Sequence, residues 1–202
     1  MQDKKSIAVF GGAFNPPLIS HYNFAKEILE KYANIYKIIF VPVSTKYDKA
    51  DLVTDEHRYN MLKLLCEKDY NIEISKTEIN STRQLYTLET LDLIQKENIN
   101  DDIIFILGTD NLKQFPSWYK PEQILKKHKL LVLKRNNEDI KEIINSNKLL
   151  HKYKGSIIYG EGIEQINLSS TYARECIKKG KDVSNIVPKK VLEYINKNHL
   201  YK

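Results

Sequence analysis

The chain of 202 residues is long enough to bury a hydrophobic core and suits one domain spanning residues 1–202. Apolar residues make up 42% and charged residues 29% of the chain, which excludes disordered and fibrous classes. The formal net charge of +6 favours phosphorylated substrates, although charge alone leaves nucleic acid as an alternative. Because the sequence has neither a signal-peptide pattern nor an apolar run of roughly 20 residues, we expect a cytoplasmic protein.

Short runs rich in Ile and Val recur along the chain and predict strands that are buried on both faces. These runs are IAVF (7–10), KIIFVPV (37–43), NIEI (71–74), DIIFIL (102–107), KLLVLK (129–134) and SIIY (156–159). Helical patterns separate them. This alternation predicts an α/β fold with a mainly parallel sheet, helices on both faces, and a ligand crevice beyond the carboxyl ends of the strands.

Two of the helical patterns have a clear apolar face, with side chains at steps of three and four. After the first strand the face consists of Leu18, Tyr22, Ala25, Leu29 and Tyr32, and after the third strand of Leu85, Leu88, Leu91 and Ile94. The segments 169–180 and 188–200 predict two helices that close the domain, and Pro188 suits the start of the second.

The loop after the first strand, within SIAVFGGAFNPPLISH (6–21), has the residues of a phosphate site. Gly11 and Gly12 lack a β-carbon, so the backbone can turn sharply and approach a ligand closely. The helix expected to begin near Leu18 would turn its free N–H groups toward the crevice, with His21 in its first turn. For a glycine pair alone, an ordinary strand-to-helix turn with a surface histidine is the alternative interpretation.

The pattern GGxFxPPxxxH resembles the GxFDPxHxGH signature of the nucleotidylyltransferase superfamily, and most closely that of the bacterial nicotinate-nucleotide adenylyltransferases. Five more segments resemble that family in the expected order: 54-TDEHRYNMLKLL, 82-TRQLYTLET, 106-ILGTDNLKQFPSWYK, 134-KR and 168-LSSTYAR. The resemblance covers nearly the whole chain. It implies a Rossmann-like nucleotidylyltransferase fold with a C-terminal helical segment.

The activity that the resemblance implies is adenylyl transfer from ATP to nicotinate mononucleotide, which yields nicotinate adenine dinucleotide and pyrophosphate in NAD biosynthesis. It implies Mg²⁺ bound through the ATP phosphates, no metal ligands among the side chains, and neither nucleic acid nor a membrane as partner. Two alternatives stay open. The chain could be a non-catalytic nucleotide-binding homologue, or an adenylyltransferase for nicotinamide mononucleotide or another phosphorylated acceptor such as phosphopantetheine.

The resemblance also assigns residues to roles. The predicted catalytic residues are His21, Lys49 and Arg174. The predicted ATP-binding residues are Gly11, Gly12, Phe14, His21, Lys46, Gly108, Asp110, Ser169, Ser170, Thr171 and Arg174. The predicted substrate-binding residues are Asn15, Thr87, Trp118, Tyr119 and Arg135. Either Lys46 or Lys49 serves the triphosphate, Asp110 could instead cap a helix, and Ser169 could be a plain N-cap.

The chain departs from the family signature at three positions of the first loop. Leu18 and Ser20 replace the first histidine and the glycine, and Asn15 replaces the aspartate. Leucine cannot donate a hydrogen bond to phosphate, but His21 occupies the second histidine position. We therefore expect an active enzyme in which the Leu18 side chain turns into the core, on the same face as Tyr22.

Overall fold

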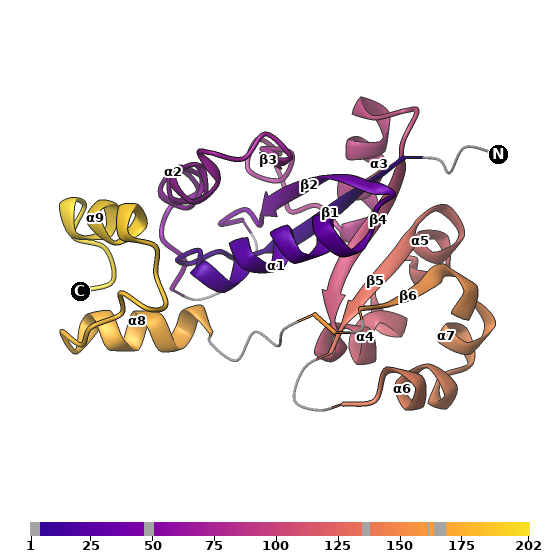
Figure 1. Ribbon diagram of the computed structural model, residues 1–202. Helices are drawn as coiled ribbons and strands as arrows, with labels where there is room; N and C mark the ends of the chain where they lie inside the picture. Colours follow the sequence, from indigo (N-terminus) through magenta and orange to yellow (C-terminus); the bar gives the residue numbers. More distant parts are fainter. Residues whose placement is uncertain (1–4, 47–50, 135–137, 161, 164–168) are drawn as a thin grey trace.

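The computed structural model describes residues 5–46, 51–134, 138–160, 162–163 and 169–202, and their strands form a six-stranded parallel sheet (Figure 1). The strand order is β3-β2-β1-β4-β5-β6. The strands are β1 (Ser6–Gly12), β2 (Ile35–Pro42), β3 (Ile72–Ile74), β4 (Asp102–Gly108), β5 (Lys129–Leu133) and β6 (Ile157–Gly160). All six predicted strands and their parallel pairing are therefore confirmed.

Helices cover both faces of the sheet, as predicted. One face carries α1 (Ile19–Lys31) and α2 (Asp55–Cys66). The other carries α3 (Thr87–Glu97), α4 (Thr109–Gln114), α5 (Pro121–Lys127), α6 (Ile140–Ser146) and α7 (Lys148–Lys152), with 3₁₀ turns at Phe115–Ser117 and Lys154–Ser156.

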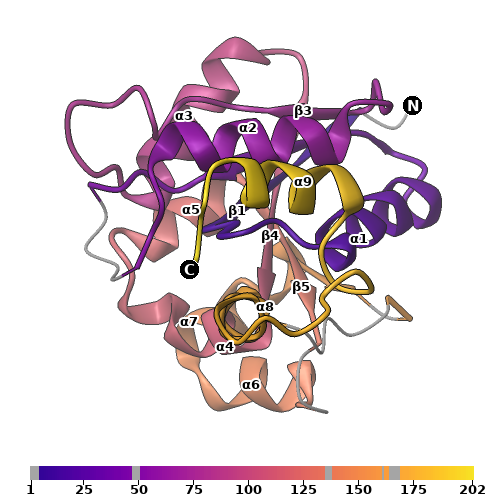
Figure 2. The same ribbon diagram turned by 90° about the vertical axis from the view of Figure 1, so that its left-hand side faces the viewer.

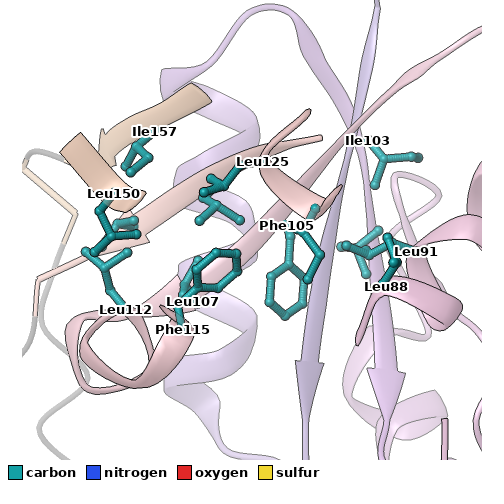
Figure 3. Close-up of a cluster of buried hydrophobic side chains, with 14 of the residues drawn as sticks. Leu88, Leu91, Ile103, Phe105, Leu107, Leu112, Phe115, Leu125, Leu150 and Ile157 are labelled. Carbon is teal, nitrogen blue, oxygen red and sulfur yellow. The ribbon is translucent and has the colours of Figure 1, made fainter. Parts of the chain in front are cut away.

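Strand β4 shows how the sequence divides the core into two layers. Phe105 and its neighbours two residues away on either side point toward α3, α4 and α5 (Figure 3). Ile104 and Ile106 point the opposite way, toward α1 and α2. Successive side chains of a strand alternate between faces, so a continuous apolar run buries both faces of the sheet.

The chain ends in two helices, α8 (Ser170–Lys178) and α9 (Lys189–Lys197), which lie beside α1 and α2 at one end of the molecule (Figures 1 and 2). They share a third apolar cluster with Met61 of α2, and the Ile19 N–H donates to the Ile186 carbonyl at 2.9 Å. Pro188 immediately precedes α9, as predicted. The C-terminal segment is thus packed against the start of α1.

The apolar face predicted for α1 is partly wrong. The buried residues are Phe24, Ala25 and Ile28, whereas Tyr22 and Tyr32 are only half-buried at the margins. The reason is that a tyrosine hydroxyl needs a polar partner. The Tyr22 hydroxyl donates to Asp69 at 3.2 Å, and the Tyr32 hydroxyl donates to the Tyr159 carbonyl at 3.1 Å.

His128 is a buried polar residue between α5 and β5. Its ring nitrogens have no hydrogen-bond partner among the described residues, and Nε2 lies 3.9 Å from Asp92 Oδ1. Burial lowers the pKa of His128, and Asp92 only partly opposes this effect. The folded protein therefore holds this ring neutral at a pH where the unfolded chain binds a proton.

We predict that acid destabilises the protein partly through His128. Below the unfolded-state pKa of about 6.5, each pH unit costs at most about 1.4 kcal/mol through this group, until the folded pKa is reached. Urea unfolding at several pH values, compared between the unmodified chain and His128→Phe, measures this contribution. The difference in unfolding free energy between the two proteins should change between pH 7.5 and 5.5. A difference independent of pH would contradict the prediction.

Candidate active site

The carboxyl ends of the strands form the ligand edge of the sheet. The strand order reverses direction between β1 and β4, because β2 follows β1 on one side and β5 follows β4 on the other. In open parallel sheets the ligand crevice lies at this switch point. The loop after β1 and the first turn of α4 flank it, so the loop predicted to bind phosphate lies at the expected place.

Arg58 of α2 holds the loops of this edge together. Its side chain is fully buried, and its guanidinium donates to the carbonyls of Ala13, Val43 and Val53 and to the Asp55 carboxylate. Burial lowers the pKa of Arg58 while Asp55 raises it, and arginine stays charged throughout. The sequence predictions omitted Arg58, although it lies in one of the segments that resemble the family.

His21 is held in the first turn of α1 by its own helix. The Leu18 N–H donates to His21 Nδ1 at 2.9 Å. The ring lies edge-on to Phe10 and to Phe14, with centroids 6.0 Å and 5.1 Å away. Because Nδ1 accepts a hydrogen bond, the proton of the neutral ring is on Nε2, which makes Nε2 a donor.

Phe14, predicted to bind ATP, is 2% exposed and packs in the core. Its backbone has a φ of 46°, in the left-handed region. The ring fills the space beside Gly12, where a β-carbon would come within 3.0 Å of it. Gly12 is thus needed for the aromatic packing that orients His21, whereas a β-carbon on Gly11 would find ordinary contacts.

The Leu18 side chain is fully buried, which confirms that it turns into the core. It does not share a face with Tyr22, however, because Leu18 precedes the helix in an extended conformation and so does not follow the helical period. It packs in the C-terminal cluster with Met61, Ala173, Cys176, Val183, Ile186, Val187, Val191 and Ile195. Ser20 Oγ is buried and has no hydrogen-bond partner among the described residues.

The first turn of α8 is attached to the loop after β1. Ser169 caps the helix, since its side chain accepts the Tyr172 N–H at 3.1 Å. The Ser170 hydroxyl donates to the Pro16 carbonyl at 2.9 Å. The structure therefore brings two of the predicted phosphate-binding segments into contact.

Arg174, one turn further on, contacts the same loop. Its Nη1 donates to the Asn15 carbonyl at 2.9 Å, and its Nη2 is 3.5 Å from Thr171 Oγ1. Asn15, predicted to bind substrate, is 1% exposed and its side-chain amide is engaged within the protein. In this structure Asn15 therefore helps to hold the loop in place.

A cavity of about 460 Å³ lies between β1, α3 and the segment after α4. Thr87, Trp118 and Tyr119 line it together with Gly11 and Gly12, so the structure brings three of the five predicted substrate-binding residues to the glycine loop. Thr87 is the first residue of α3. The cavity thus combines a hydroxyl at a helix N-terminus with an aromatic wall.

The aromatic wall is built from two neighbouring groups of rings. Trp118 is half-buried against Phe105 and Phe115, with ring centroids 6.2 Å and 5.3 Å away. Tyr119 stacks on Tyr86 with centroids 4.4 Å apart and planes at 22°. Tyr86 lines the cavity but was not among the predicted residues, although it adjoins Thr87.

Glu78 also lines the cavity and was missed by the sequence predictions. Its carboxylate accepts a hydrogen bond from Thr90 Oγ1 at 2.8 Å. Burial raises the pKa of Glu78, and the positive charge of Arg58 opposes this shift. A single glutamate in a polar stretch has no periodic signal that could have identified it.

The remaining predicted residues lie around the edge or outside the described part of the chain. Gly108 ends β4, and Asp110 is half-buried in the first turn of α4. Lys46 is exposed. Lys49 and Arg135 fall outside the described residues. Among the residues that the structure does describe, no group of three His, Cys, Asp or Glu side chains could hold a metal ion, and no helix is long and apolar enough to cross a membrane.

The switch-point crevice, the glycine loop and the adjoining helix starts define a Rossmann-like nucleotide-binding protein. The sequence profile described as cytidylyltransferase-like matches residues 9–176. A relative in Clostridium tetani, named "Probable nicotinate-nucleotide adenylyltransferase", is 34% identical and covers 98% of this chain and 100% of its own. A relative of the same name in Caldicellulosiruptor bescii is 37% identical and covers 97% of this chain and 98% of its own.

Solved structures agree on the fold. A structure described as Plasmodium falciparum nicotinic acid mononucleotide adenylyltransferase complexed with NaAD has a TM-score of 0.77 at 21% identity. The match covers 98% of this chain and 97% of that one. The profile match and the relatives together show that the chain belongs to the cytidylyltransferase-like family, in its nicotinate-nucleotide adenylyltransferase branch.

We predict that His21 has two separable functions, capping α1 through Nδ1 and donating through Nε2. In His21→Asn the amide oxygen can replace Nδ1, so stability should be kept while kcat falls on the order of a hundredfold. In His21→Gln the amide nitrogen can replace Nε2, so more activity should remain while the lost cap costs about 1 kcal/mol. Thermal unfolding and steady-state kinetics of both variants measure this. Equal kcat in the two variants would contradict a donor role.

Proposed function

We propose that this chain transfers the adenylyl group of ATP to nicotinate mononucleotide and releases pyrophosphate. The observation that carries the proposal is the junction at Gly11 and Gly12. There a loop of the phosphate-binding type meets a cavity with an aromatic wall. The relatives named above support this assignment, because each covers nearly the whole chain and bears the name of that activity.

In this reaction a phosphate oxygen of the mononucleotide attacks the α-phosphorus of ATP. A new P–O bond forms while the bond from the α-phosphorus to the oxygen bridging to the β-phosphorus breaks, and pyrophosphate leaves. The nucleophile is already an anion, so no covalent enzyme intermediate is needed. The protein contributes by aligning the two phosphates and by stabilising the charge that develops on their oxygens.

The residues for this task lie along the loop after β1. His21 Nε2 and the N-terminal N–H groups of α8 would stabilise the phosphate oxygens, whereas the first N–H group of α1 already donates to the Ile186 carbonyl. Arg174 would add charge next to that loop, since a guanidinium has further N–H donors beyond the one that contacts Asn15. Lys46 or Lys49 would serve the leaving pyrophosphate.

We propose that Mg²⁺ enters with ATP, held by its phosphate oxygens. Magnesium commonly keeps several waters and is bound through substrate phosphates with few protein ligands. When bound, it would neutralise phosphate charge and so favour both attack and departure of pyrophosphate. Asp110, at the ligand edge, would accept hydrogen bonds from the ribose hydroxyls.

The cavity would hold the pyridine ring of the acceptor. Trp118 offers a flat face for stacking on it. The Thr87 hydroxyl and the N–H groups at the start of α3 would receive the nicotinate carboxylate, because a helix N-terminus favours an anion. A neutral carboxamide would gain less from this position, so the cavity favours the acid over the amide.

We predict that the purified chain uses nicotinate mononucleotide with a much higher kcat/KM than nicotinamide mononucleotide in the presence of ATP and Mg²⁺. Pyrophosphate release measured with each acceptor in turn tests this. Equal values would overturn the acid preference and leave adenylyl transfer intact. ATP binding without product from either acceptor would instead favour the non-catalytic alternative.

We also predict that the two half-sites fail differently. Trp118→Ala removes the stacking surface, so the KM for the pyridine nucleotide should rise with little change in the KM for ATP. Arg174→Ala removes a charge-assisted donor, so ATP binding should weaken by about 1.5 to 3 kcal/mol. Initial rates with each substrate varied in turn separate the two effects. The same ATP defect in both variants would show that the half-sites are wrongly placed.

A further inference from the structure

Asn15 joins three segments of the ligand edge. Its Oδ1 accepts the Tyr201 hydroxyl at 2.7 Å and the Val53 N–H at 3.3 Å. Its Nδ2 donates to the Asp51 carbonyl at 2.7 Å, and its own carbonyl accepts from Arg174. The loop after β1 is thereby connected to the segment before α2, to α8 and to the segment that follows α9.

Three residues that adjoin or contact Asn15 have strained backbone conformations. Phe14, Asp51 and Tyr201 have φ values of 46°, 65° and 63°, in the left-handed region that favours glycine. Phe14 precedes Asn15 in the chain, while Asp51 and Tyr201 are its hydrogen-bond partners. Such conformations are unfavourable for residues other than glycine and persist where the surroundings hold them, often at functional sites.

Tyr201 is suited to hold this position. Tyr201 follows α9 and packs against the third apolar cluster. This cluster also contains Leu18 of the first loop. Burial raises the pKa of Tyr201 despite the nearby positive charges of Arg174 and Arg58. The phenol therefore stays protonated at physiological pH and donates its hydrogen to Asn15.

We propose that Tyr201 is a positioning residue for adenylyl transfer, acting through Asn15 on the loop that leads into Leu18 and His21. The inference rests on the proposed function and extends it to a residue 186 positions away in the sequence. Without the hydroxyl, Asn15 keeps only the longer bond to Val53 on its oxygen, and the loop gains freedom. Because transfer requires close alignment of two phosphates, this freedom reduces the rate of the bound complex.

The same contacts account for asparagine where the family signature has aspartate. Nδ2 faces a backbone carbonyl, and a carboxylate oxygen in that place would set two acceptors against each other. The amide therefore matches this chain's own partners, with one donor for Asp51 and an acceptor for Tyr201. Asn15 and Tyr201 function together as one connection.

The test compares Tyr201→Phe with Tyr194→Phe. Each change removes one hydroxyl from the C-terminal segment. The Tyr194 hydroxyl lies 2.9 Å from His57 Nδ1 and accepts from Asn60 at 3.3 Å, so it joins α9 to α2 without contacting the loop. We expect Tyr201→Phe to lower kcat about five- to tenfold with little change in either KM, and Tyr194→Phe to leave kcat unchanged. Unchanged kcat in Tyr201→Phe, or an equal fall in both, would overturn the proposal.

A second readout does not depend on the acceptor. Hydrogen exchange of the backbone amides in residues 11–18 should quicken in Tyr201→Phe and stay the same in Tyr194→Phe, with no nucleotide present. This measurement decides the positioning role even if the unmodified chain makes no dinucleotide, an outcome that would overturn the proposed function alone. Exchange that is equally fast in both variants would overturn the inference.

A double mutant identifies the path of the effect. In the Asn15→Ala background, Tyr201→Phe should lower kcat no further, because the partner of the hydroxyl is already gone. Two independent falls in kcat that simply multiply would show that Tyr201 acts elsewhere, and would overturn the connection through Asn15.

Discussion

The ligand edge of this protein depends on the burial of one positive charge. Arg58 is fully buried, and it can be accommodated because three carbonyls from two loops and one carboxylate converge on it. A buried cation that lost these partners would cost several kcal/mol, so the loops have to fold around it together. The planar, forked guanidinium suits several carbonyls at once in a way that a lysine ammonium does not.

The groups around Arg58 are of two kinds: side chains that hold the loops in shape, and groups proposed to bind ligands. The side chains of Asn15 and Ser170 bond to other parts of the protein and hold the loop after β1 in shape. The groups proposed to bind ligands are the His21 ring, the start of α8, and the cavity with its aromatic wall. Preorganised donors act best when their supports are rigid, which is why so many polar contacts face inward.

The same supporting contacts accommodate the departure of the first loop from the family signature at Leu18. Leu18 takes its side chain into the C-terminal cluster, while its N–H remains at the helix start and fixes the His21 ring. An apolar residue there strengthens the contact between α1 and the C-terminal helices. The second histidine keeps its orientation through a backbone group, which no side-chain change at position 18 removes.

The sequence by itself determined the strands, the parallel sheet and the edge at which the candidate site lies, because these follow from short-range periodicity and from glycine and proline positions. Through a family resemblance, the sequence also predicted Thr87 and Trp118 as substrate-binding residues. Only the tertiary structure decided the positions and contacts of Arg58, Glu78 and Tyr201, and the face on which Leu18 packs. These contacts join residues as far apart in the sequence as 15 and 201, and they depend on how helices and loops converge in space. Local pattern has no information about that convergence, since polar residues in loops and helix ends carry no period.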